Sequence, residues 1–244
     1  MPDHPDGPPA FVRLAAHPLR WRLLTELGGS DHRVRDLVAL LGEPQNLVSY
    51  HLRLLREGGL VTTRRSSFDG RDSYYRLDVD RCGAALTTTG TALHPALTFQ
   101  PTPQAPPARD DVTVLFVCTG NTARSPIAEA LLRHHSGGRV TATSAGTRPG
   151  AALHPGAVRV LRTRFGIDAD QRPRHVETLT GRRFTHVITL CDKAREACPD
   201  FRATPRRAHW STPEPGDDHT FGDVAADLDT RVRHLLPSLE EGLS

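Results

Sequence analysis

One short stretch of the sequence combines a cysteine, an arginine and a serine at a spacing that suits nucleophilic chemistry on an anion. Residues 112–130 read VTVLFVCTGNTARSPIAEA, so that an apolar run leads directly into Cys118, followed by Arg124 and Ser125. A loop between a strand and a helix points backbone N–H groups into a cup, and a helix N-terminus attracts anions. We expect these dipoles to favour the thiolate of Cys118, Ser125 to donate to it, and Arg124 to hold two oxygens of a tetrahedral anion.

The cup itself is made by the residues between the nucleophile and the helix. Gly-Asn inside the loop and Ser-Pro after it are typical of a turn and of a helix start. A cysteine that merely packs at the end of a buried strand is the alternative, and it needs neither feature. We expect the oxyanion to be bound by Thr119, Gly120, Asn121, Thr122, Ala123 and Arg124.

Two more thiols lie downstream, in the segment TLCDKAREACP. Cys191 and Cys198 are seven residues apart. On one helix they would share a face two turns apart, about 10 Å along the axis. A disulfide needs Cα atoms within roughly 7 Å, so pairing them requires the segment to unwind. Two nearby thiols can supply electrons, which a reductase needs and a phosphatase does not. The alternatives to this redox role are that the two thiols are incidental or that they bind a structural metal.

The chain length and a proline-rich segment indicate two domains. The chain has 244 residues, and residues 100–109, QPTPQAPPAR, contain four prolines typical of a stiff connector. We expect one domain over residues 8–98, a linker over 99–110 and a second domain over 111–244.

Composition excludes several classes of protein. Hydrophobic residues make up 37% and charged residues 24%, as in globular proteins. No apolar run is long enough to span a membrane, and the first residues lack the apolar core of a signal peptide. We therefore expect a cytoplasmic protein with no membrane partner, in which four cysteines serve chemistry rather than structural disulfides.

The first domain has the pattern of a helix, a short turn and a second helix. Apolar residues recur at helical spacing over residues 10–27, interrupted by Pro18, then over 33–41 and 45–57. Two segments in which apolar and polar residues alternate, one on each side of Asp69-Gly70, predict a β-hairpin. Polar residues early on the 45–57 helix and arginines near the hairpin can read a DNA groove and bind phosphates. The candidates are Gln45, Asn46, Ser49, Tyr50, Arg53, Arg64, Arg65 and Arg71.

These features resemble the winged helix-turn-helix of the ArsR/SmtB repressor family, through LAAHPLRWRLL, SYHLRLLREGGLV and the hairpin ending YYRL. The resemblance implies a double-stranded DNA operator and a homodimer through this domain. Many members carry a cysteine pair on the helix before the recognition helix, and HRVRDLVALL has none. Cys82 is a single thiol, more typical of a small buried hydrophobe, so we expect no metal site.

The second domain is similar to the low-molecular-weight phosphotyrosine phosphatase superfamily, through the loop from Cys118 to Ser125. Strand and helix patterns alternate through TATSAGT, HPGAVRVLRTRFGI, FTHVITL, RRAHW and DVAADLDTRVRHLL. The expected fold is three-layer α/β with a four-stranded parallel sheet in flavodoxin-like order, beside a mainly α winged helix-turn-helix domain.

The segment TLC(x6)CP followed by HW resembles the thioredoxin-coupled arsenate reductases of that fold. The resemblance implies that Cys118 attacks arsenate, Cys191 attacks Cys118, Cys198 attacks Cys191, and thioredoxin reduces the last disulfide. In this family an aspartate before proline is the general acid; here Glu214 occupies that position, with Asp217 and Asp218 as alternatives.

Some members of this family bind potassium, and Asn121, Glu129 and Ser144 match that site, while His175 stands at the remaining carboxylate position. No tightly bound cofactor is otherwise implied.

We therefore interpret the chain as a transcriptional regulator fused to an arsenate reductase, acting in arsenic resistance. The rivals are a low-molecular-weight protein-tyrosine phosphatase fused to a DNA-binding domain, and a repressor whose phosphatase fold only senses oxyanions. No tyrosine lies in the second domain to stack on an aromatic substrate, and EPGDDHTF offers only Phe221, which favours a small inorganic oxyanion.

Overall fold

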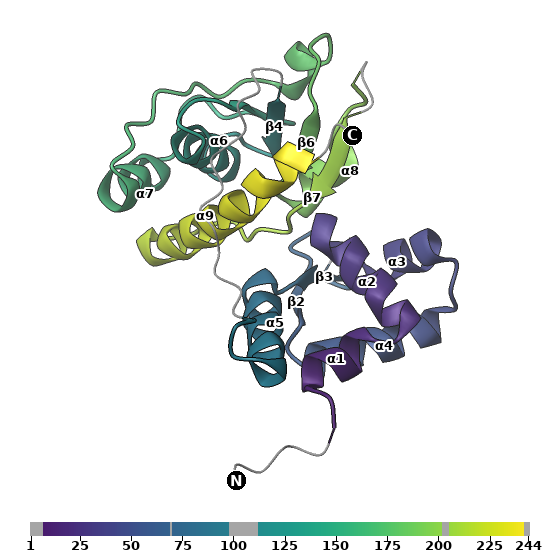
Figure 1. Cartoon of the computed structure of the whole chain (residues 1–244). Helices are drawn as coiled ribbons and strands as arrows, with labels where there is room; N and C mark the ends of the chain where they lie inside the picture. The colour runs from purple at the N-terminus through teal and green to yellow at the C-terminus, as the bar shows by residue number, and fades with distance from the viewer. Residues whose placement is uncertain (1–6, 69, 98–111, 202–204, 242–244) are drawn as a thin grey trace. The chain divides into compact units, whose positions relative to one another are not determined.

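The computed structural model describes residues 7–68, 70–97, 112–201 and 205–241. The chain divides into two compact units, Met1–Pro103 and Gln104–Ser244, which are described separately (Figure 1). The expected linker, residues 99–110, lies outside the described residues. Within those residues no helix combines the length and the apolarity that crossing a bilayer requires.

The first unit is a small helical domain with a three-stranded sheet. Its elements are α1 (Ala10–Ala15), α2 (Pro18–Gly29), β1 (His32–Arg33), α3 (Val34–Leu41), α4 (Gln45–Glu57), β2 (Val61–Arg65), β3 (Ser73–Leu77) and α5 (Val79–Leu93). Pro18 opens α2 because its fixed φ and missing N–H suit a first helical turn. The helix expected from residue 33 begins at Val34, since Arg33 is extended and pairs with β3.

The predicted hairpin is formed by β2 and β3, which pair antiparallel from Val61↔Leu77 to Arg65↔Ser73. Asp69 of its turn lies outside the described residues, and Gly70 has a φ of 65°. The predicted inner face of α4 is confirmed, because Val48, Leu52 and Leu55 are fully buried.

The second unit is the expected α/β domain. Its elements are β4 (Thr113–Cys118), α6 (Arg124–His135), β5 (Thr141–Gly146), α7 (Pro155–Phe165), the 3-10 turn η1 (Val176–Leu179), β6 (His186–Thr189), α8 (Asp192–Ala197), β7 (Arg206–His209) and α9 (Asp218–Glu241). The four strands are parallel in the order β5-β4-β6-β7, which confirms the flavodoxin-like sheet.

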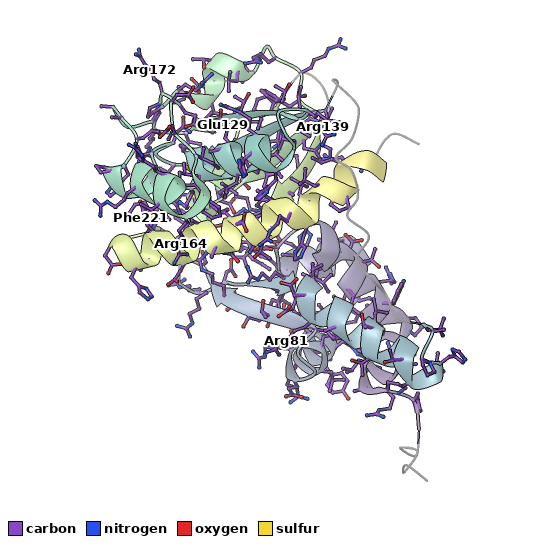
Figure 2. All side chains as sticks on the ribbon, turned by 60° about the vertical axis from the view of Figure 1, so that its left-hand side comes forward. Arg81, Glu129, Arg139, Arg164, Arg172 and Phe221 are labelled. Atoms are coloured by element: carbon purple, nitrogen blue, oxygen red, sulfur yellow. The ribbon has the colours of Figure 1, made fainter. Side chains whose placement is uncertain are left out.

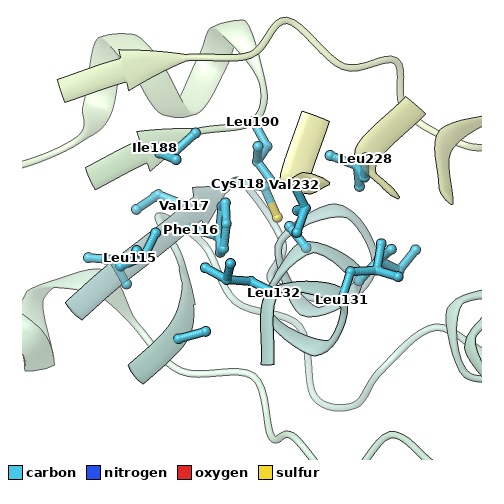
Figure 3. Packing of buried hydrophobic residues seen from close by; sticks show 14 of the residues in the cluster. Leu115, Phe116, Val117, Cys118, Leu131, Leu132, Ile188, Leu190, Leu228 and Val232 are labelled. Carbon is cyan, nitrogen blue, oxygen red and sulfur yellow. The ribbon is translucent and has the colours of Figure 1, made fainter. Parts of the chain in front are cut away.

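β4 runs through the middle of the core, with helices on both sides. Its residues from Val114 to Cys118 are all buried, as expected for a central strand covered on both faces. Figure 3 shows Cys118 at the end of this strand, with Leu132 of α6 and Val232 of α9 nearby. The strand therefore delivers Cys118 to the carboxyl edge of the sheet, where ligands bind in open α/β folds.

Helices α7 and α9 pack closely where one has a glycine. A Cβ on Gly156 would lie 2.6 Å from the ring of Phe221, so only hydrogen fits there. Arg164 of α7 donates from Nη1 to the carbonyl of Gly222 at 2.9 Å, and Figure 2 labels Arg164 and Phe221 at this junction. Phe221 is thus part of the core and stacks on His154, with ring centroids 4.6 Å apart.

Candidate active site

The thiol of Cys118 lies in a buried cluster of hydrogen-bond donors. Its sulfur is 3.0 Å from Ser125 Oγ and accepts from the backbone N–H of Asn121 at 3.2 Å. Cys118 is 2% exposed and Ser125 fully buried. Both contacts stabilise a negative sulfur when Ser125 donates, because each presents a proton to it.

A second loop orients the peptide groups of the first. The carbonyls of Cys118, Thr119, Gly120 and Thr122 accept from the amides of Thr147, Arg148, Gly150 and His154, at 2.8–3.1 Å. In a planar trans peptide the next N–H points opposite to the carbonyl. The amides of residues 119, 120, 121 and 123 therefore face away from the second loop, and that of Asn121 meets the Cys118 sulfur. These amides are the donors that the predicted anion cup requires.

Asn121 holds this loop in shape. It has a φ of 48°, a left-handed conformation that asparagine adopts more readily than most residues. Its Nδ2 donates to Ser125 Oγ and Ser144 Oγ, and its Oδ1 accepts from the amide of Arg174 at 2.9 Å. Since Ser125 Oγ already accepts from Asn121, its own proton is directed to the Cys118 sulfur at 3.0 Å or, at 3.4 Å, to the carbonyl of Ala145.

Arg124 opens α6 and is 95% buried. Its Nη1 donates to the carbonyl of Thr212 at 3.2 Å, and its Nη2 lies 3.9 Å from Glu214 Oε2. The Glu214 side chain is 80% exposed, so it sits at the mouth of the site beside the arginine that would hold the anion. The structure therefore brings Glu214 to the site predicted for it.

The alternative acid Asp217 is engaged elsewhere. Its carboxylate accepts from the amide of Thr220 at 2.9 Å at the start of α9. The backbone and hydroxyl of Thr220 lower the pKa of Asp217, which makes it a poor proton donor. Nothing is described of the Asp218 side chain.

The second cysteine lies against the anion loop. Cys191 is 3% exposed, and its sulfur is 3.2 Å from the Oγ1 of Thr119. The parallel strands β4 and β6 are hydrogen-bonded neighbours, which brings their carboxyl ends together. The structure thus places Cys191 beside the loop that begins at Cys118.

The two downstream cysteines do not lie within one helix, which was the case in which they would share a face. They flank α8 as its N-cap and C-cap residues, and both have extended backbone. Polar and charged side chains fill the helix between them. Cys198 is half-buried, and burial raises the pKa of its thiol to about 11, with Arg207 opposing and Asp200 adding to the shift. All four cysteines are free thiols.

Sequence reasoning missed a buried polar cluster directly behind Cys191. Asp192 is 2% exposed, and its Oδ1 lies 3.1 Å from His209 Nε2 and 2.9 Å from Ser211 Oγ. His209 Nδ1 is 2.8 Å from Thr189 Oγ1. The sequence gives little indication of this cluster, because no local pattern shows that Asp192, the acidic residue after Cys191, is buried.

The residues that match a potassium site are partly engaged with other groups. The Asn121 carbonyl oxygen already accepts from Arg174, and the Glu129 carboxylate is paired with Arg133 one turn along α6. Burial raises the pKa of Glu129, opposed by Ser144 and Arg133. His175 uses Nδ1 to cap η1. The guanidinium of Arg133 pairs with Oε1 of Glu129, whereas Oε2 is buried without a hydrogen-bond partner. In the described part of the chain no three histidine, cysteine or acidic residues group as metal ligands.

In the first unit, the predicted DNA-reading side chains lie together on α4. Gln45, Asn46, Ser49, Tyr50 and Arg53 are all exposed, and the guanidinium of Arg53 lies 5.5 Å from the Tyr50 ring centroid.

The other predicted DNA-binding residues are three arginines on or beside the β2–β3 hairpin. Arg64 and Arg65 lie on β2, and Arg71 precedes β3 and is exposed. Cys82 is half-buried near the carbonyl of Leu60, and burial raises the pKa of its thiol to about 11.

Comparisons with known proteins match both units. A family model described as low molecular weight phosphotyrosine protein phosphatase covers residues 113–244, and one described as a helix-turn-helix domain covers residues 15–64. An arsenate reductase from Brevibacillus brevis is 33% identical over 131 residues, spanning 52% of this chain and 96% of that protein.

Two solved structures are also similar. The arsenate reductase of Archaeoglobus fulgidus is 31% identical over 51% of this chain and 98% of that one, with a TM-score of 0.44. The thioredoxin-dependent arsenate reductase of Corynebacterium glutamicum is 28% identical over 53% of this chain and 62% of that one, with a TM-score of 0.43.

Proposed function

The chain belongs to the low molecular weight phosphotyrosine protein phosphatase family through residues 113–244, and we propose that within this family it is an arsenate reductase fused to a DNA-binding domain. The observation that carries the proposal is the second buried thiol, because Cys191 lies 3.2 Å from Thr119 of the anion loop. The name of the Brevibacillus brevis relative supports the same assignment.

The first step is attack by the Cys118 thiolate on arsenic. The anion binds in the cup of amides, with Arg124 holding two of its oxygens. The sulfur forms a bond to arsenic as an oxygen leaves, and Glu214 supplies the proton that lets it depart as water. Before the attack the backbone N–H of Asn121 donates to the sulfur at 3.2 Å, and the Ser125 hydroxyl lies 3.0 Å from it.

The second step reduces arsenic. The Cys191 thiolate attacks the Cys118 sulfur, forming a Cys118–Cys191 disulfide and breaking the sulfur–arsenic bond. The bonding electron pair goes to arsenic, which leaves as arsenite, so As(V) gains the two electrons that the two thiols lose. The contact of Cys191 with Thr119 supports this step, because Cys118 and Cys191 lie at the carboxyl ends of two neighbouring parallel strands.

The third step carries the oxidation outward. The Cys198 thiolate attacks Cys191, and Cys118 departs as a thiolate ready for another turnover. Cys198 is more exposed than the other two sulfurs. Thioredoxin, a dithiol reductant, then reduces the Cys191–Cys198 disulfide.

The substrate is a small inorganic oxyanion rather than an aromatic ester. Phe221, the one Phe, Tyr or Trp among residues 215–241, is 2% exposed and stacks on His154. It is therefore not free to stack on a tyrosyl substrate.

Cys191→Ser tests the relay directly. With thioredoxin, thioredoxin reductase and NADPH, we expect the wild type to form arsenite over many turnovers and the variant to lose this activity. Cleavage of a chromogenic phosphate ester, which needs only Cys118, Arg124 and an acid, should persist in both. Arsenate turnover retained by the variant would refute the relay.

A phosphatase of small phosphomonoesters is the second candidate, favoured by the fact that Cys118, Arg124 and Ser125 alone make a complete anion and nucleophile site. It predicts ester cleavage in both proteins and no steady-state arsenite from either. A protein that only senses oxyanions predicts neither reaction.

For the first unit we propose operator binding through α4 and the hairpin arginines. Arg53→Ala should weaken binding to duplex DNA and reduce the slope of log affinity against log salt by about 1, if Arg53 contacts one phosphate. Leu40→Ala, on the exposed surface of α3, is the matched control and should leave the salt slope unchanged. Affinity and slope that do not change in Arg53→Ala would refute the assignment of α4.

A homodimer through this unit is also proposed. Val79, Leu86 and Leu93 recur every seven residues on α5, which places them near one face, and they are 40%, 42% and 74% exposed. Leu86→Lys should shift the sedimentation of the chain from dimer to monomer, whereas Thr88→Lys, elsewhere on the helix, should not.

A further inference from the structure

The residue after Cys191 is tied into the sheet by buried hydrogen bonds. A buried carboxylate is stable only when it is well paired, and Asp192 is paired with His209 Nε2 and Ser211 Oγ at 3.1 and 2.9 Å. An ionised carboxylate only accepts, so in that state His209 Nε2 donates to Asp192; on the other side of the ring, His209 Nδ1 lies 2.8 Å from Thr189 Oγ1. Four buried side chains therefore connect the start of α8 to the ends of β6 and β7.

The other end of α8 is held differently. After Cys198, Arg207 Nη2 donates to the carbonyl of Pro199 at 3.0 Å and to Asp200 at 2.9 Å. The Asp200 side chain is fully exposed and that of Arg207 is 44% exposed. Ion pairs at such positions contribute little stability, so between Cys198 and the buried Phe201 the polar contacts of this end are weaker than those of Asp192.

The cysteines at the two ends must approach each other for a disulfide to form. A helix of six residues is about 9 Å long, and a disulfide needs Cα atoms within roughly 7 Å. At least one of the two cysteines must therefore move.

We propose that Asp192 is a positioning residue that fixes Cys191 beside the anion loop, so that Cys198 is the cysteine that moves. This rests on the proposed thiol relay. In the transfer step the Cys198 thiolate attacks Cys191, the Cys191–Cys198 bond forms, the Cys118–Cys191 bond breaks, and its electron pair leaves on Cys118. Helix α8 opens from Cys198 towards Cys191, while Asp192, His209 and Ser211 stay bonded.

Asp192→Ala and Asp192→Asn separate position from charge. The asparagine Oδ1 can still accept from His209 and Ser211, whereas alanine removes both bonds. Reduced full-length protein is mixed with one equivalent of arsenate without reductant, quenched by alkylation, and its disulfides are measured by mass spectrometry. We expect Asp192→Ala to slow formation of the Cys118–Cys191 disulfide at least tenfold and Asp192→Asn to stay within about twofold of wild type.

Asp200→Ala, an exposed carboxylate on the same segment, is the control and should match wild type. Asp192→Ala forming the disulfide at the wild-type rate, or Asp192→Asn as slow as Asp192→Ala, would overturn the positioning role. Should Asp192→Ala fail to fold, Ser211→Ala removes one of the two donors and should give a smaller slowing in the same direction.

A second measurement does not depend on arsenate chemistry. In reduced protein, iodoacetamide should alkylate Cys191 at least tenfold faster in Asp192→Ala than in wild type, while Cys198 changes less than twofold. Equal effects on both thiols, or none on Cys191, would overturn the proposal. If wild-type protein forms no disulfide with arsenate, the relay fails, and the alkylation ratio still decides whether Asp192 fixes Cys191.

Discussion

The Oγ1 of Thr119 lies 3.2 Å from the Sγ of Cys191, so the loop that begins at Cys118 also contacts the second thiol. Either atom can donate, and a thiolate on Cys191 can only accept. Thr119 therefore presents a proton to Cys191 when that sulfur is ionised and about to attack. This single contact connects anion binding to thiol exchange.

We expect Thr119→Val to slow formation of the Cys118–Cys191 disulfide about 3- to 10-fold, because one hydrogen bond to the attacking thiolate is lost. Thr119→Ser keeps the hydroxyl and should stay near the wild-type rate. The measurement is a quenched single turnover with arsenate followed by mass spectrometry. Equal rates for the valine and serine variants would contradict this role.

In the folded, reduced protein Cys198 should be mostly protonated at neutral pH, so that only a small thiolate fraction reacts. Its pKa is raised to about 11 by burial, so the thiolate fraction in the folded protein rises about tenfold per pH unit until pH approaches that value. The rate of alkylation of Cys198 should follow this rise between pH 7 and 10. In denaturant the midpoint should fall towards the ordinary range for cysteine; a folded-state midpoint near 8.5 would contradict the burial effect.

Asn121→Ala should destabilise the second unit by roughly 2–4 kcal/mol, because three hydrogen bonds lose a partner inside the protein. Asn46→Ala changes the other asparagine of the chain, which is exposed on α4, and should alter stability by no more than about 0.5 kcal/mol. Denaturant unfolding measures both. A loss below 1 kcal/mol for Asn121→Ala would mean that the loop keeps its shape without this side chain.

Gly156→Ala should destabilise the same unit by about 1–3 kcal/mol, since the new methyl group would lie 2.6 Å from the buried ring of Phe221. Gly83→Ala has open space on helix α5 and should stabilise the first unit by about 0.5–1 kcal/mol. Thermal unfolding should show a loss of stability for Gly156→Ala and a gain for Gly83→Ala. Adding Phe221→Leu to Gly156→Ala should recover part of the loss, and no recovery would place the strain elsewhere.

The sequence predicted the parts of the fold that depend on local patterns. The buried run before Cys118 and the helix over residues 45–57 are both present, because their apolar periodicity agrees with their burial. β1 was missed because two residues carry no periodicity, and its pairing with β3 is set by tertiary contacts. The sequence reasoning did not predict α5, whose run of threonines and glycines has weak helix propensity.

In the candidate site, too, the sequence predicts the residues that are close together in the chain and misses those that tertiary contacts bring together. Cys118, Arg124 and Ser125 are within eight residues, so their spacing alone predicts one loop. The contact of Asp192 with His209 joins residues 17 apart through two strands, and no local signal shows which acidic residue is buried. The flanking positions of Cys191 and Cys198 also depended on where α8 begins and ends, which sequence patterns define least well.

The four carbonyl contacts between residues 118–122 and residues 147–154 are made by main-chain atoms on both sides. Main-chain pairing places little demand on side-chain identity, apart from Gly150, where a Cβ would lie 2.7 Å from Thr122, and His154, whose ring stacks on Phe221. The second segment can therefore drift in composition over evolution while the receptor for the anion keeps its geometry. Its length, by contrast, is constrained, since inserting one residue would shift every pairing that follows.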